Sequence, residues 1–148
     1  MALPLIERDR LPAAAVAARV EAALAEVGLA EAGDLYPAEV SGGMVKRAAF
    51  ARAIIEEPEV LFFDEPTSGL DPVMARTIDS LIEQLNRAHG AACVVVTHDL
   101  AGALRYADRI AFLKGGRFLE VCTPAQILHS TVPEVQQFLR AQTVEAQP

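Results

Sequence analysis

Two acidic residues, a histidine and a Ser-Gly-Gly sequence occupy places where they could handle phosphate groups. Asp64 and Glu65 follow a short apolar run, residues 60–63. His98 follows a second such run, and Ser41 opens an alanine-rich stretch with a helical pattern. Short apolar runs bounded by turn residues predict strands buried on both faces. Open α/β sheets bind ligands at the carboxyl ends of their strands, so these residues together predict half of a nucleotide-hydrolysing site.

The two carboxylates are predicted to have different roles, because neighbouring strand residues point to opposite sides. One carboxylate can hold Mg²⁺ through its water shell while the next acts as general base toward an attacking water. His98 can hydrogen-bond a terminal phosphate and orient that water. Taken one at a time, a solvated acidic turn and a capped loop histidine are the commoner meanings of Asp64-Glu65 and His98.

Ser41, Gly42 and Gly43 predict an anion site at a helix start. Unpaired backbone N–H groups, the helix dipole and a hydroxyl converge there, and glycine lets a phosphate approach the backbone. Ordinary capping is the simpler alternative for this sequence alone. The turn from Ser68 to Asp71, likewise, reads alone as a capped helix entry. No Gly-x-x-x-x-Gly-Lys-Ser/Thr phosphate loop occurs in the 148 residues.

Composition excludes several classes of protein. The formal net charge of −7 argues against nucleic-acid binding, which needs a basic surface. No apolar run approaches the roughly 18 residues that span a bilayer, and charged residues from Glu7 to Arg10 argue against a signal peptide. Cys93 and Cys122 lack a Cys-x-x-Cys pattern, and we expect both to be buried and reduced in the cytoplasm.

Alternating helices and strands predict an α/β layer architecture with a parallel sheet. Helices are expected at residues 12–27, 41–57, 71–89 and 100–106, a hairpin at 109–121 around Gly115-Gly116, and two final helices beginning near residues 123 and 132. The strands at residues 60–64 and 93–97 are expected to pair in parallel through a right-handed crossover.

In combination, the segments resemble the second half of an ABC-type ATPase subunit. Four motifs carry the resemblance. Val40–Met44 is similar to the signature motif, and Lys46, Arg47 and Arg52 match the basic positions of the helix that follows it. Val60–Pro66 is similar to the Walker B strand, Ser68–Asp71 is similar to the D-loop, and His98 is similar to the switch histidine. Val40 and Met44 depart from the commonest leucine and glutamine. The Ser-Gly-Gly-Met form is most similar to ATPases of bacterial intermembrane phospholipid transporters, which work with mammalian-cell-entry-type (MCE) lipid-binding proteins.

The resemblance implies ATP and Mg²⁺ as cofactors. Glu65 and His98 would be catalytic, Ser41, Gly42, Gly43 and Asp71 would bind nucleotide, and Asp64 would hold Mg²⁺ through water. The implied fold is a P-loop NTPase-like α/β sheet, which is incomplete without the half that carries the phosphate loop. The expected subdomains are a helical signature subdomain at residues 1–57, part of the ATPase core at residues 58–122, and C-terminal helices and a tail at residues 123–148.

The implied function is the ATP-hydrolysing subunit of a transporter, peripheral on the inner face of the cell membrane, with lipid as the expected cargo. The implied partners are a second ATPase subunit, a membrane permease and an MCE-type component. Without a phosphate loop, we expect no turnover by the chain alone. A truncated product, a fragment and a misplaced start codon all remain open. The alternative is a non-catalytic regulatory piece that lends its signature face to a complete partner subunit.

Overall fold

The computed structural model describes residues 1–7 and 11–145, with side chains as far as residue 142. By its internal contacts the chain forms two compact units, Met1–Val96 and Thr97–Pro148, and each is described by itself. The charged residues 8–10 and the last residues of the tail, 146–148, lie outside the described residues. The subdomain boundaries expected at residues 57 and 122 follow function rather than compactness, and they stay a prediction.

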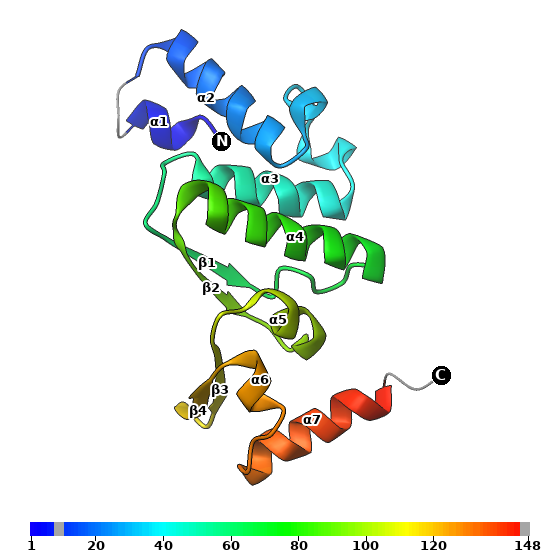
Figure 1. Ribbon diagram of the computed structural model, residues 1–148. Helices are drawn as coiled ribbons and strands as arrows, with labels where there is room; N and C mark the ends of the chain where they lie inside the picture. The colour runs from blue at the N-terminus through cyan, green and yellow to red at the C-terminus, as the bar shows by residue number, and fades with distance from the viewer. Residues whose placement is uncertain (8–10, 146–148) are drawn as a thin grey trace. The chain divides into compact units, whose positions relative to one another are not determined.

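The first unit consists of helices on one side of a two-stranded parallel sheet (Figure 1). Its elements are α1 (Leu3–Glu7), α2 (Ala13–Glu26), the 3₁₀ turns η1 (Ala30–Ala32) and η2 (Pro37–Glu39), α3 (Gly42–Ile54), β1 (Val60–Asp64), α4 (Pro72–His89) and β2 (Ala92–Val96). The sequence did not predict α1 or the two 3₁₀ turns, and β2 lies one residue earlier than expected; the other elements match the expected ones. The α3 helix ends three residues earlier than expected.

Local sequence signals set the ends of the two long helices. Pro12 precedes α2, and Gly28 adopts a left-handed conformation with φ 69° just after it. Asp71 caps α4 through its side chain, and Gly90 ends that helix with φ 63°. These are conformations that glycine adopts without the steric cost of a Cβ atom. The helix boundaries predicted from these residues are confirmed.

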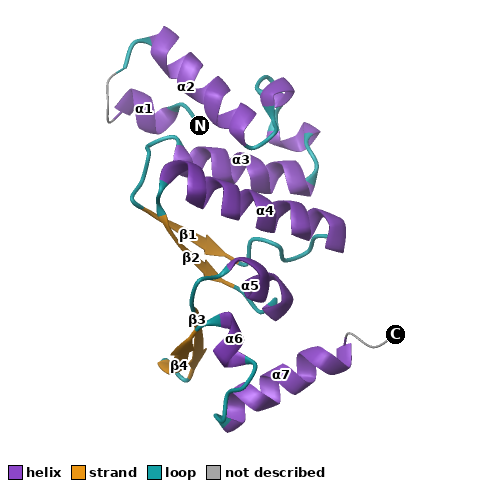
Figure 2. Ribbon diagram, in the orientation of Figure 1, coloured by secondary structure: helices purple, strands orange, loops and turns teal. Residues whose placement is uncertain are grey.

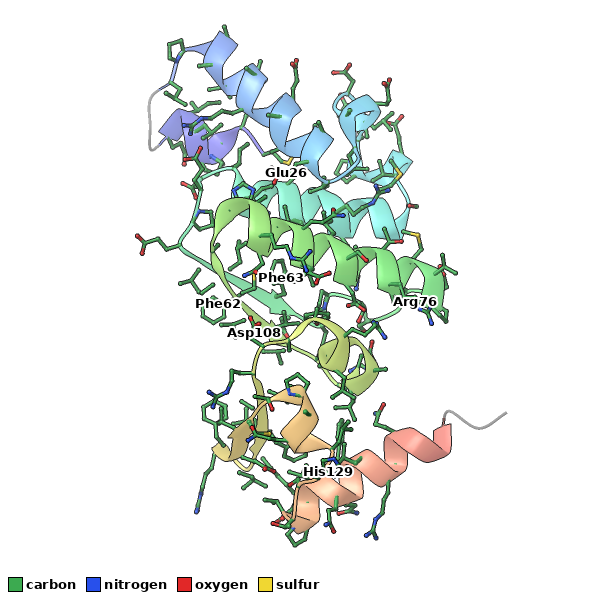
Figure 3. All side chains as sticks on the ribbon, viewed as in Figure 1. Glu26, Phe62, Phe63, Arg76, Asp108 and His129 are labelled. Carbon is green, nitrogen blue, oxygen red and sulfur yellow. The ribbon has the colours of Figure 1, made fainter. Side chains whose placement is uncertain are left out.

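The strands β1 and β2 pair in parallel, with Val60 opposite Ala92 and Asp64 opposite Val96. The predicted pairing is therefore confirmed, but the prediction that both strands are buried on two faces is wrong. Phe63 is 5% exposed, whereas its neighbour Phe62 is 76% exposed (Figure 3). The helices cover only one face of this sheet, so alternate side chains of each strand remain open.

The core of the first unit lies between the covered sheet face and the helices. Phe50 of α3 and Phe63 of β1 meet edge to face, with ring centroids 4.7 Å apart. Ile78 and Ile82 of α4 are 0% and 2% exposed. Burial of these apolar side chains is the main stabilising term for the unit. The core therefore fixes α3 and α4 against the strand that ends at Asp64.

The second unit contains an antiparallel hairpin and three helices (Figure 2). Its elements are α5 (Leu100–Tyr106), β3 (Ile110–Lys114), β4 (Arg117–Cys122), α6 (Pro124–Ile127) and α7 (Pro133–Glu145). Gly115 and Gly116 form the hairpin turn at φ 58° and 74°, as their sequence predicts. Cys122, Ile127 and Val135 form its buried cluster.

Within the described residues, β3 pairs with β4 and β1 with β2, in two separate two-stranded sheets. No helix of the described part of the chain is both long and apolar enough to cross a membrane.

Candidate functional site

The start of α3 has the features of an anion-binding helix end. Ser41 is the N-cap, and its Oγ accepts a hydrogen bond from the N–H of Met44 at 3.3 Å. The N–H groups of Gly42 and Gly43 belong to the first turn, where a helix offers them no internal acceptor. A Cβ atom at Gly42 would meet nothing within 4 Å, so the backbone there is open to an approaching group. A helix start of this kind suits a phosphate.

Gly43 lies where α3 meets the first turn of α4. A Cβ atom at this position would come 2.7 Å from the Cε atom of Met74. A side chain at this position would force the flexible end of Met74 to move, so the contact shows close packing between the two helices but does not by itself require glycine. The contact places the N-termini of two helices, capped by Ser41 and Asp71, close together.

The carboxyl end of β1 carries the two acidic residues. Asp64 is the last strand residue and is exposed, while Glu65 lies just beyond it and is half-buried. Glu65 adopts φ 46°, a left-handed conformation that is costly for a residue with a side chain. The prediction treated both residues as part of the strand, but only Asp64 is. Their side chains still point to different environments, because the backbone turns sharply at Glu65.

Main-chain hydrogen bonds hold Glu65 in this conformation. Its N–H donates to the carbonyl oxygen of Val96 at 2.8 Å, and its own carbonyl accepts from the N–H of Ser68 at 3.2 Å. Strained backbone persists where the surroundings determine it, and it is frequent at functional sites. The loop continues through Gly69, at φ 74°, to Asp71, whose Oδ1 accepts from the N–H groups of Val73 and Met74 at 2.9 and 3.0 Å.

Two neighbouring basic residues of α3 bind main-chain carbonyls of different loops. Lys46 donates to the carbonyls of the loop after β1, and Arg47 donates to those of Val27 and Gly28 at 3.2 and 3.0 Å. Sequence reasoning placed both only as basic positions of the signature helix. The loops they hold lie 19 to 22 residues away, and no local sequence signal specifies such partners.

His98 belongs to the second unit and is exposed. Its neighbours are fixed by local hydrogen bonds. The Oγ1 atom of Thr97 accepts from the N–H of Asp99 at 3.0 Å, and Asp99 caps α5 by accepting from the N–H of Gly102 at 3.0 Å. His98 is therefore presented on an ordered turn at the entry to a helix. Its predicted role at a phosphate is not tested by this geometry.

Other titratable groups have structural surroundings. The Nε2 atom of His89 lies 2.6 Å from the carboxylate of Glu26 and joins the end of α4 to the end of α2. Burial raises the pKa of both thiols, Cys93 and Cys122, and a hydrogen bond from Asn86 partly offsets the effect at Cys93. Both cysteines are free thiols, Cys122 buried and Cys93 half-buried.

The described residues offer one possible carboxylate ligand for Mg²⁺ and one helix start for a phosphate of a nucleotide. They contain no group of three or more His, Cys, Asp or Glu side chains able to enclose a metal ion. Mg²⁺ keeps most of its water and takes one or two carboxylates together with phosphate oxygens, so one exposed carboxylate, Asp64, is a compatible ligand. The Ser41-capped start of α3 is compatible with a phosphate.

Known proteins share both sequence and fold with this chain. Residues 5–68 match the family model described as ABC transporter. A methionine import ATP-binding protein of Pectobacterium atrosepticum is 39% identical over 142 residues, covering 95% of this chain and 41% of the relative. The intermembrane phospholipid transport ATP-binding protein of Escherichia coli is 41% identical over 139 residues, covering 94% of this chain and 52% of the relative.

A solved structure agrees with these sequence matches. CbiO1 of Clostridium perfringens, part of an ABC transporter complex, superimposes with a TM-score of 0.80 at 26% identity and covers 94% of this chain and 59% of its own. The chain thus spans about half the length of the relatives it matches. The chain has an α/β fold of the ABC ATPase type, and its residues 5–68 match the ABC transporter family.

Proposed function

We propose that these residues form the signature-bearing part of an ATP-hydrolysing subunit of an ABC transporter. The observation that carries the proposal is the joining, within one compact unit, of a Ser41-capped helix start and the strand end at Asp64 and Glu65. The matches to ATP-binding subunits of transporters support it. ATP and Mg²⁺ are the proposed cofactors.

In this proposal each residue has a definite task. Ser41 and the N–H groups of Gly42 and Gly43 bind phosphate oxygens of a nucleotide held by a second subunit, and Asp71, which caps α4, also contributes to nucleotide binding. Asp64 would hold Mg²⁺ through water, and the ion when bound neutralises phosphate charge. Glu65 orients the attacking water and accepts its proton at the carboxylate. His98 contacts the terminal phosphate, a role that rests on the sequence resemblance.

The proposed partners are a second ATPase subunit and a membrane permease, at the cytoplasmic face of the cell membrane. We propose phospholipid as the cargo class, with an MCE-type lipid-binding component. The Ser-Gly-Gly-Met sequence and the similarity to a phospholipid transport protein support this choice. Similar identity to methionine import proteins makes methionine the alternative cargo. In an assembly with the permease, stimulation of ATP hydrolysis by phospholipid vesicles but not by methionine would separate the two.

The test of ATP hydrolysis compares the chain alone with the same chain joined behind a phosphate-loop segment of an ABC-type ATPase. We expect steady-state phosphate release only from the joined form, at about 1–100 s⁻¹. Glu65→Gln should lower that rate at least about 100-fold while ATP still binds, because an amide cannot accept the proton. Glu59, an exposed glutamate before the other end of β1, is the matched control.

Two results would contradict the proposal. A joined protein in which Glu65→Gln and Glu59→Gln both leave the rate within a few-fold would remove the general-base assignment. A joined protein that never hydrolyses ATP, yet raises the turnover of a complete partner subunit, would favour the regulatory alternative.

A further inference from the structure

The ammonium group of Lys46 makes three hydrogen bonds to the loop that follows β1. It donates to the carbonyl oxygens of Ser68 at 2.6 Å, Pro66 at 2.9 Å and Glu65 at 3.4 Å. A lysine ammonium has three donor hydrogens, and this loop offers three acceptors. Hydrogen bonds from a charged donor are stronger than neutral ones. Lys46 therefore holds this turn at three points over four residues.

The residue most affected by this turn is Glu65. Its φ of 46° is unfavourable, and its N–H is bonded to Val96 on the neighbouring strand. The carbonyl of Glu65 receives both the N–H of Ser68 and, at longer distance, the ammonium of Lys46. Loss of the ammonium would leave three main-chain carbonyls without this donor and would allow the strained turn to relax. The direction of the Glu65 side chain depends on that backbone.

Lys46 also belongs to the helix whose start is the proposed phosphate site. Lys46 lies five residues, or about 1.4 helical turns, after the N-cap Ser41, and a helix holds such a separation rigidly. The same helix start packs against α4 at Met74, just after the cap formed by Asp71. The loop that begins with Glu65 is therefore attached at one end to β1, at the other to α4, and in its middle to α3.

We propose that Lys46 is a positioning residue that ties the Glu65 turn to the signature helix. The contacts of Lys46 keep the carboxylate of Glu65 at a fixed position relative to a phosphate bound at the start of the same helix. Lys46 does not touch the reacting atoms in this arrangement, since its donors serve the main chain. The inference rests on the proposed function, because Glu65 needs a reaction in which its position matters.

Arg47 offers a matched control in the next position of the helix. It too donates to two main-chain carbonyls, but they belong to Val27 and Gly28 after α2. Substitution of either residue by methionine removes one positive charge and keeps a long apolar stem. A general loss of stability would affect both variants alike. A positioning role specific to Glu65 belongs to Lys46 alone.

The first measurement is hydrogen exchange in the 148-residue chain, which needs no turnover. Lys46→Met should speed exchange of the amides of residue 65 and residues 67–70 about tenfold or more, because the charged clamp is lost. Arg47→Met should instead speed exchange near residues 28–32. Unchanged exchange at 65–70 in Lys46→Met would overturn the clamp itself.

The second measurement uses the chain joined to a phosphate-loop segment, as above. Lys46→Met should lower kcat about 10- to 100-fold with KM for ATP nearly unchanged, since small displacements of a catalytic group have such effects. Lys46→Arg, which keeps charge and donors, should recover most of kcat. Equal losses of kcat in Lys46→Met and Arg47→Met, or no recovery by Lys46→Arg, would overturn the proposal. Failure of the unsubstituted joined protein to hydrolyse ATP would instead count against the proposed function.

Discussion

The neighbours Phe62 and Phe63 allow a direct test of the one-sided sheet. Phe63 is 5% exposed and packs edge to face on Phe50, whereas Phe62 is 76% exposed. Phe63→Ala should lower the free energy of unfolding by about 3–5 kcal/mol, from lost burial and the cavity left behind. Phe62→Ala should change it by less than about 0.5 kcal/mol at protein concentrations low enough to keep the chain monomeric, because the ring is then in water.

These magnitudes are large compared with the about 5–15 kcal/mol that stabilises an ordinary domain. For a compact unit of this size, each kcal/mol corresponds to about 4–8 °C in Tm, so Phe63→Ala should melt at least about 12 °C lower. Thermal and urea unfolding followed by far-ultraviolet circular dichroism would measure both variants. A loss for Phe62→Ala as large as that for Phe63→Ala would show that the open sheet face is covered in solution and would refute the one-sided arrangement.

Three further predictions concern local features. Asp71→Ala should cost about 1 kcal/mol in urea unfolding, because the cap of α4 is lost, whereas Asp34→Ala in an exposed loop should cost little. Glu57→Gly should raise the free energy of unfolding by up to about 1 kcal/mol, because Glu57 has a left-handed φ of 51°. Glu56→Gly should lower it by about 0.5–1 kcal/mol, so thermal melts should show Tm changes of opposite sign for the two variants. Burial raises the pKa of Cys122 in the folded chain above its ordinary 9.0. The stabilisation that comes from this shift is fully present below pH 9.0 and is lost as the pH rises through the folded-state pKa. Cys122→Ala should therefore make the urea midpoint fall less steeply above about pH 9.

The open sheet face has a consequence for association. Val60, Phe62, Val94 and Val96 are 46%, 76%, 43% and 56% exposed, on the same side of the paired strands. Exposed apolar patches and unpaired strand edges favour aggregation. We therefore expect the purified chain to be poorly soluble or oligomeric, and Phe62→Lys to reduce association in analytical ultracentrifugation. A monodisperse monomer without that substitution would contradict this expectation.

Sequence reasoning succeeded where the determinants are local. Asp71 and Gly90 bound α4 because capping and a left-handed stop depend on one residue each, and the same holds for Gly115-Gly116 in the hairpin. The motif order also pointed to the observed fold. The burial of β1 and β2 was predicted wrongly, because an apolar run shows that a strand can be covered on two faces but does not show whether both covers are present.

The site was predictable in its residue types but not in its connections. Asp64 and Ser41 lie at the strand end and helix start that their neighbours in sequence indicate. The conformation of Glu65 and its support by Lys46 depend on carbonyl oxygens that every residue carries, so no side-chain pattern identifies them in advance.

This difference explains why Lys46 is informative. A basic residue on the signature helix suggests contact with a phosphate, which carries negative charge. The structure instead gives all three donor hydrogens of Lys46 to uncharged main-chain carbonyls. Hydrogen bonds from a charged donor are stronger than neutral ones, so this use of the charge stabilises a turn that the left-handed Glu65 makes unfavourable. The charge of Lys46 therefore helps to fix the turn that carries the Glu65 carboxylate. The proposed phosphate site consists of Ser41 and the backbone N–H groups at the start of the helix.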